Sequence, residues 1–64
     1  MKLLDLLEFV DNTQSVVVRD GNSNIFGTAE SILDTDTPEL YRDVKCIYVG
    51  EWDALEIELW RNNE

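Results

Sequence analysis

The sequence predicts an α+β fold in which an N-terminal helix packs on a four-stranded, mainly antiparallel sheet made of two hairpins. Three observations predict it. The first ten residues place apolar side chains at helical spacing, and residues 14–28 and 43–60 each have the pattern of strand, turn and strand. A short helical connection separates the two hairpins. The expected element order is therefore α-β-β-(short helix)-β-β, in one domain that spans residues 1–64.

The N-terminal helix is predicted over residues 2–10. Asp5 and Glu8 lie on its polar side, while Leu4 and Phe9 widen its apolar arc beyond one face. A helix of about two turns is not stable alone in water, so it is expected to dock on the sheet. Its docking stripe is formed by Leu3, Leu6, Leu7 and Val10.

The first hairpin is predicted around an Asp-Gly-Asn-Ser turn, a sequence that tolerates positive φ. With the turn centred on residues 21 and 22, the ladder pairs Val18 with Ile25 and Val17 with Phe26. Three consecutive valines in the first strand favour this assignment, because β-branched residues are enriched in strands.

The segment that follows is predicted to be a short helical connection. Gly27, inside the return strand, predicts a bulge or a close backbone approach. A brief helical turn is expected over Ala29–Leu33. Thr37 and the proline after it have the pattern of an N-cap and a first helical residue, so one further turn is expected over Pro38–Arg42.

The second hairpin contains the clearest strand pattern of the chain. Over residues 55–59, leucine and isoleucine alternate with Glu56 and Glu58, as a strand with one buried face requires. The strand before it, residues 44–49, is apolar on both faces and rich in β-branched and aromatic residues.

The burial pattern also predicts the register of this hairpin. A turn centred between residues 52 and 53 pairs Tyr48 with Ile57 and Cys46 with Leu59, so that all four side chains face the core. The loop then holds an even number of residues. A slip by one residue brings Glu56 opposite Tyr48 on the core side, and the prediction excludes that slip.

In this register, an apolar surplus projects from the sheet face opposite the helix. Lys45 is expected to lie beside Trp60 in a cation–π contact. Because a half-exposed sheet normally carries polar residues on its outer face, this face is expected to be covered. Two coverings stay open: the connection over residues 29–42, or a second copy or partner. The predicted dimer face comprises Val17, Phe26, Ile47, Val49 and Trp60.

The charge of the chain restricts its partners. With 14 acidic and 5 basic residues, the formal net charge is -9. This excludes ordinary nucleic-acid binding by phosphate neutralisation and disfavours anionic membranes. It permits attraction to a basic protein, although acidity that only maintains solubility is the alternative. The acidic surface predicted to bind such a partner comprises Glu51, Asp53, Glu56 and Glu58.

The residue inventory favours a protein without catalytic activity, cofactor or metal. No histidine is present, and a single cysteine makes neither a disulfide nor a tetrahedral zinc site. Cys46, expected on the core face, has no base to activate it. Two glutamates on an open strand face lack the cleft that paired-carboxylate catalysis needs. One unpaired cysteine and an apolar start interrupted by carboxylates predict a cytoplasmic protein without a signal peptide or membrane span.

Several segments resemble small acidic proteins from phages and integrative elements of Gram-positive bacteria. The similarity is carried by M-K-L-x-D-L-L-x-x-V-D at the start, R-D-G after the first strand, D-V-K-x-I-Y-V in the third strand and A-L-E-I-E-L in the last. The resemblance implies a mobile-element context and assigns no catalytic or binding residue. Small acidic phage proteins, anti-CRISPR and anti-restriction proteins among them, often disarm host machinery by binding it.

Two functions are therefore expected as alternatives. The first is a mobile-element accessory protein that binds, and inhibits, a basic host nucleic-acid-handling protein through the acidic surface, without touching nucleic acid itself. The second is a structural or adaptor module that self-associates as a homodimer through the apolar sheet face.

Overall fold

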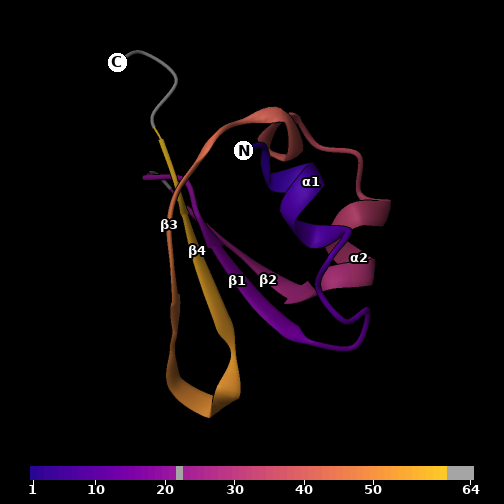
Figure 1. Ribbon diagram of the computed structural model, residues 1–64, viewed down its shortest axis with the longest axis vertical. Helices are drawn as coiled ribbons and strands as arrows, with labels where there is room; N and C mark the ends of the chain where they lie inside the picture. The colour runs from indigo at the N-terminus through magenta and orange to yellow at the C-terminus, as the bar shows by residue number, and fades with distance from the viewer. Residues whose placement is uncertain (22, 61–64) are drawn as a thin grey trace.

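The computed structural model describes residues 1–21 and 23–60. It has two layers, a sheet and a helical layer that covers one of its faces (Figure 1). The elements in chain order are α1 (Leu3–Leu7), β1 (Ser15–Arg19), β2 (Asn24–Thr28), α2 (Ala29–Asp34), a 3-10 turn (Pro38–Tyr41), β3 (Val44–Val49), a second 3-10 turn (Glu51–Asp53) and β4 (Leu55–Leu59).

The four strands form one sheet in the order β2-β1-β4-β3. Each hairpin is antiparallel, and the two hairpins join through β1 and β4, which run parallel in the middle of the sheet. The predicted α+β class and element order are confirmed. No helix in the described ranges is long and apolar enough to cross a membrane.

The core lies between the helical layer and the sheet. Leu3 and Leu7, one helical turn apart, are fully buried, and Leu6 and Val10 pack beside them, which confirms the predicted docking stripe. The helix itself is shorter than predicted. The other buried side chains are Val16, Val18, Ala29, Ile32, Leu40, Ile57 and Leu59.

The first hairpin has the predicted register, with Val18 opposite Ile25 and Val17 opposite Phe26. Its ladder runs through Gly27 without a bulge, and this glycine instead marks a close approach. A Cβ at position 27 would lie 2.5 Å from the Ser31 hydroxyl oxygen of α2. The absence of a side chain therefore lets α2 turn back tightly onto β2.

The segment over residues 29–42 packs on the same side of the sheet as α1. Thr28 caps α2: its N–H donates to the Ser31 hydroxyl at 2.9 Å, and the Ser31 N–H donates to the Thr28 hydroxyl at 3.2 Å. Ala29 and Ile32 then enter the core shared with α1. Of the two coverings left open for the opposite face, the connection is therefore excluded, and no other described element covers that face.

The register predicted for the second hairpin was wrong by one residue. Tyr48 lies opposite Glu56, and Ile47 lies opposite Ile57. The loop comprises residues 50–54 and is centred on Trp52. Cys46 lies opposite Glu58 instead of Leu59, so Cys46 and Tyr48 project to the open face while Ile47 and Val49 project to the helix side.

The cause of this error lies in β3. Its two faces are both apolar, so alternation does not identify the face that meets the core. A bulge between Val44 and Cys46 changes the alternation, and Val44 faces the core side opposite Leu59. The bulge also turns Lys45 toward the open face, where its ammonium lies 5.1 Å from the Trp60 ring. The predicted cation–π contact is confirmed.

Arg42 joins three parts of the chain at the other end of the sheet. Its guanidinium lies 3.9 Å from the Asp20 carboxylate and donates to the backbone carbonyls of Asp20 and Trp60. The Arg42 and Asp20 side chains are only 13% and 11% exposed. This largely buried ion pair ties the end of β1 to the end of β4.

Candidate functional site

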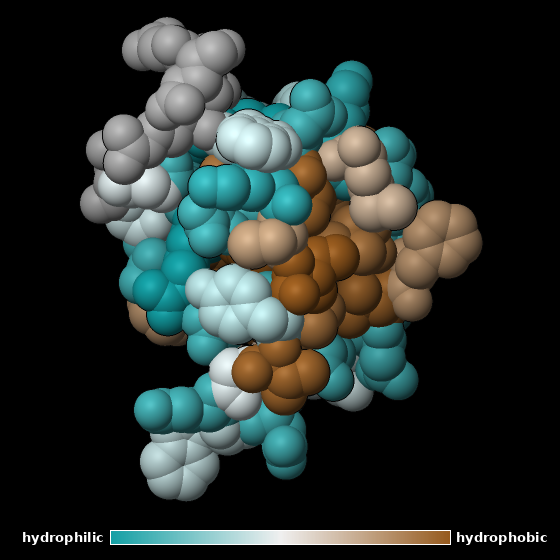
Figure 2. Space-filling view, turned by 60° about the vertical axis from the view of Figure 1, so that its left-hand side comes forward, coloured by the Kyte–Doolittle hydropathy of each residue, from teal (hydrophilic) through white to brown (hydrophobic). Residues whose placement is uncertain are grey.

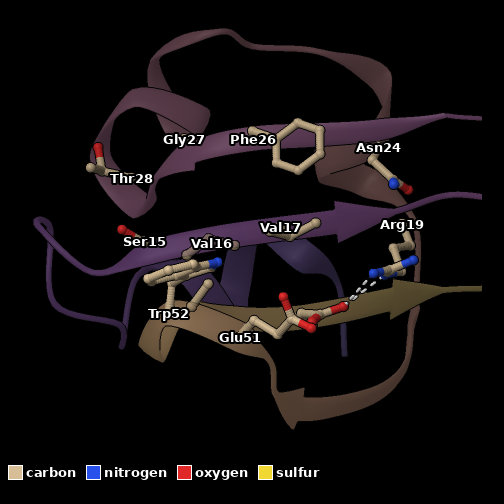
Figure 3. A pocket seen from close by; sticks show the side chains of 12 residues that line it. Ser15, Val16, Val17, Arg19, Asn24, Phe26, Gly27, Thr28, Glu51 and Trp52 are labelled. Carbon is tan, nitrogen blue, oxygen red and sulfur yellow. Dashed lines mark hydrogen bonds and ion pairs between the residues drawn. The ribbon is translucent and has the colours of Figure 1, made fainter.

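The uncovered face of the sheet carries a shallow groove of about 690 Å³. Phe26, which is 72% exposed, and Val17 form its apolar floor. Trp52 stands at one end of the groove and Arg19 at the other (Figure 3). Because an exposed apolar patch rimmed by polar residues often marks an interaction site, this groove is the best candidate for a binding site in the described structure.

Trp52 is held in a backbone conformation that bulky residues avoid. Its φ is 61°, and that of Asp53 is 58°. A left-handed conformation is tolerated by aspartate but strained for tryptophan. The side chain gains no compensating packing, because it is 93% exposed. A Gln14 side-chain amide that donates to the Asp53 carbonyl at 2.7 Å helps to fix the tip.

An ion pair forms the polar end of the groove. Arg19 Nε and Nη2 donate to Glu56 Oε1 at 2.8 and 2.7 Å. The hydrogen bond and charge of Glu56 raise the pKa of Arg19 further above its ordinary value. The Glu56 carboxylate occupies the space above Gly50 that a side chain there would fill. Glycine at position 50 therefore permits this arrangement.

A second group of charges surrounds Glu58 on the same face. Lys45 Nζ lies 3.5 Å from Glu58 Oε2, and the Cys46 thiol donates to Glu58 Oε1 at 3.6 Å. Cys46 is exposed, so its predicted place on the core face was wrong. Partial desolvation is the main cause that raises the pKa of the Cys46 thiol, and the Glu58 carboxylate raises this pKa further. A thiol of this kind is a weak nucleophile at neutral pH.

The raised pKa of Cys46 predicts slow alkylation. A raised pKa reduces the thiolate fraction at pH 8, so iodoacetamide is expected to modify Cys46 more slowly than it modifies the same chain in urea. The pH midpoint of the rate should lie above that of an ordinary cysteine. Glu58→Gln should move this midpoint down, because it removes the carboxylate charge. A midpoint unchanged by Glu58→Gln would show that Glu58 does not control the thiol.

The predicted acidic surface divides into two pairs of carboxylates. Glu56 and Glu58 each meet a cation, Arg19 and Lys45 respectively, so the sheet itself neutralises them. Glu51 and Asp53 are exposed on either side of Trp52 at the hairpin tip, and no ion pair joins them to another described residue. The unneutralised half of the predicted surface is therefore the tip.

The five residues predicted to form one dimer face do not share a face. Val17 and Phe26 lie together on the open face. Ile47 and Val49 project from the helix side of β3, and Trp60 follows β4 beside Lys45. The single-face arrangement was wrong for the same reason as the register. Sequence reasoning also missed Trp52, which it treated as a turn residue; a tryptophan in a turn between two carboxylates was the available signal.

No protein-family model matches the chain, and the searches of curated proteins and of solved structures likewise find no significant match. Within the described residues, no group of three or more His, Cys, Asp or Glu side chains is arranged to hold a metal ion.

Proposed function

We propose that this chain is a non-enzymatic protein-binding module that binds a basic host protein through the tip of the β3–β4 hairpin and the adjoining groove. The observation that carries the proposal is Trp52, which is strained and almost fully exposed. Glycine would adopt the same backbone conformation without strain. Strained residues held by the surrounding structure cluster at binding sites, where the strain pre-organises a side chain for contact.

The chemistry of the tip supports a cationic partner segment. An indole face attracts a lysine or arginine side chain, and the attraction strengthens when the pair is desolvated. Glu51 and Asp53 flank Trp52 and supply carboxylates for the same cation. The net charge of -9 adds long-range attraction to a basic surface.

The class of partner that fits this chemistry best is a nucleic-acid-handling protein of the host. Such proteins expose grooves rich in lysine and arginine, which bind phosphates. An acidic module that occupies a groove of this kind excludes nucleic acid and inhibits the host protein, as anti-CRISPR and anti-restriction proteins do. Glu56 lines the groove in this proposal, and neither Glu56 nor Glu58 is expected to bind the partner's cation, since each is already paired with a cation of the sheet.

Replacement of Trp52 by glycine tests the proposal, because it separates binding from folding. Trp52→Gly is expected to weaken partner binding by about 30-fold, the effect of losing an aromatic hot-spot residue. The free energy of unfolding should stay within about 1 kcal/mol of the parent or rise, because strain is relieved and little packing is lost. A partner captured from host lysate and then purified allows affinity to be measured by calorimetry and stability by urea denaturation.

Two matched variants show whether the carboxylates act locally. Asp53→Asn removes a charge at the tip and keeps a residue that tolerates positive φ. Asp34→Asn removes an equal charge from the exposed side of α2, on the opposite layer. Only Asp53→Asn should weaken binding. Equal weakening by both variants, or parental affinity of Trp52→Gly, would contradict binding at the tip. Duplex DNA that fails to compete would contradict the nucleic-acid-handling class of partner.

A further inference from the structure

The outer edge of β3 has backbone hydrogen-bonding groups that meet no other described strand. The Gly50 N–H donates to the Ala54 carbonyl across the hairpin at 2.8 Å. Because successive residues of an antiparallel strand turn their backbone groups to opposite sides, Tyr48 also faces β4. Ile47 and Val49 therefore direct their N–H and C=O groups to the free edge, and these groups have no described backbone partner.

One end of each edge strand carries features that usually prevent strand pairing. At the start of β3, the Met1 carbonyl accepts a hydrogen bond from the Val44 N–H, and Lys2 forms an isolated β-bridge with Asp43. The bulge between Val44 and Cys46 follows. At the far edge, the Ser31 hydroxyl accepts the Thr28 N–H and donates to the Thr28 carbonyl. In β3, these features leave the second half as the open segment, while in β2 the backbone groups of Phe26 also point to a free edge.

The open segment is also apolar on its helix side. Ile47 is 44% exposed and Val49 is 75% exposed, although both project from the face that carries the core. The far end of the β3–β4 hairpin extends past the helical layer, which leaves its helix side uncovered there (Figure 1). With the β3 side of the molecule turned forward, hydrophobic side chains gather in the middle of the surface (Figure 2).

We propose that a second copy of this chain pairs with this edge, β3 against β3 in antiparallel orientation, to give a continuous eight-stranded sheet. A two-fold axis at Tyr48 pairs Ile47 of each copy with Val49 of the other. Both edge-facing residues of each strand then exchange N–H and C=O groups, four hydrogen bonds in all. On the helix side, four β-branched side chains come together across the axis.

Charge favours a second copy in this register. β3 carries one lysine and no carboxylate, so this strand brings two highly acidic chains together without opposing carboxylates. The axis at Tyr48 places Lys45 across from Glu51 of the second copy. A shift of the register by two residues in one direction places the charged Glu51 opposite the apolar Ile47. The opposite shift places the bulge at Lys45 opposite Val49, where it interrupts the ladder. The axis at Tyr48 avoids both of these pairings.

Proline at an edge-facing position tests the pairing. Val49→Pro removes an N–H that points away from β4, a change that an edge strand tolerates. Sedimentation velocity over a range of concentrations should show the parent as a dimer, and Val49→Pro should raise the dissociation constant at least about tenfold. Val49→Glu, at the same exposed site, should also raise the dissociation constant. This second variant keeps the test decisive where the proline variant does not fold. Phe26→Glu, which alters a similarly exposed apolar residue at the β2 edge, should leave the dimer unchanged.

Cysteine cross-linking tests the register. In a Cys46→Ser background, Tyr48→Cys should form an intermolecular disulfide on mild oxidation, because directly opposed residues of a non-hydrogen-bonded pair lie about 4.5 Å apart between Cα atoms. Ile47→Cys in that background should not. A parent that is monomeric at every concentration, a dimer unaffected by both Val49 variants, or efficient cross-linking through Ile47→Cys instead of Tyr48→Cys would overturn the proposal. The proposal for the hairpin tip rests on Trp52 and is tested by other variants, so either proposal can fail without the other.

Discussion

Leu7→Ala is expected to lower the free energy of unfolding by roughly 3 kcal/mol, within the range for leucines truncated in a packed core. Leu7 is fully buried and fixes α1 to the sheet. A chain of 64 residues has a total stability of about 3–10 kcal/mol, so this one change removes a large share of it. A sizeable fraction of the variant should be unfolded at 37 °C.

The measurement is urea denaturation followed by far-UV circular dichroism. Tryptophan fluorescence is a weaker probe here, because Trp52 and Trp60 are both exposed in the folded chain. Phe9→Ala is the control: Phe9 lies just after α1 but is 89% exposed, so its truncation should change stability by less than about 0.5 kcal/mol. Equal losses in the two variants would show that α1 does not dock through Leu7.

Arg42→Met is expected to destabilise the fold by about 2–4 kcal/mol. Methionine keeps much of the volume of the side chain but removes the guanidinium that pairs with the largely buried Asp20 carboxylate. Breaking a buried pair by removing one member is strongly destabilising, and the slight exposure of this pair reduces the effect somewhat. The Trp60 carbonyl also loses a donor, so the end of β4 should fray.

Arg19→Met provides the matched comparison. Arg19 also pairs with a carboxylate, but the Arg19 side chain is exposed and its ion pair is screened by water. Urea denaturation should show a clearly larger loss for Arg42→Met than for Arg19→Met. The double variant Asp20→Asn/Arg42→Met should recover part of the loss, because it removes the largely buried carboxylate charge together with the guanidinium. Similar losses for both single arginine variants would indicate that the Asp20–Arg42 pair is hydrated.

The parts of the fold that were predictable from the sequence are those with one informative periodicity. The first hairpin has a strong turn signal, and its register was predicted correctly. The stripe that includes Leu3 and Leu7 identified the docking face of α1. In β4, strict alternation identified Ile57 as a core residue.

The parts that were not predictable depend on β3 and on pairing between hairpins. An edge strand with apolar residues on both faces gives no signal for its register, and a bulge after Val44 has no clear sequence signature. The same ambiguity led the prediction to group Ile47 and Val49 with Phe26 on one face and to put Cys46 on the core face. For the candidate site, sequence reasoning found Glu51 and Asp53 but not the left-handed conformation of Trp52, which only the backbone reveals.

The parallel pair in the middle of the sheet also determines when a newly made chain can fold. Val16 and Leu55 are neighbours in this pair although they lie 39 positions apart (55 minus 16) in a chain of 64 residues. Each hairpin can form locally within microseconds, but the core stays open until β4 arrives, because Ile57 and Leu59 complete it. During translation the nascent polypeptide therefore exposes its valine-rich strand β1 until β4 has left the ribosome, and the exposed strand favours aggregation during that interval.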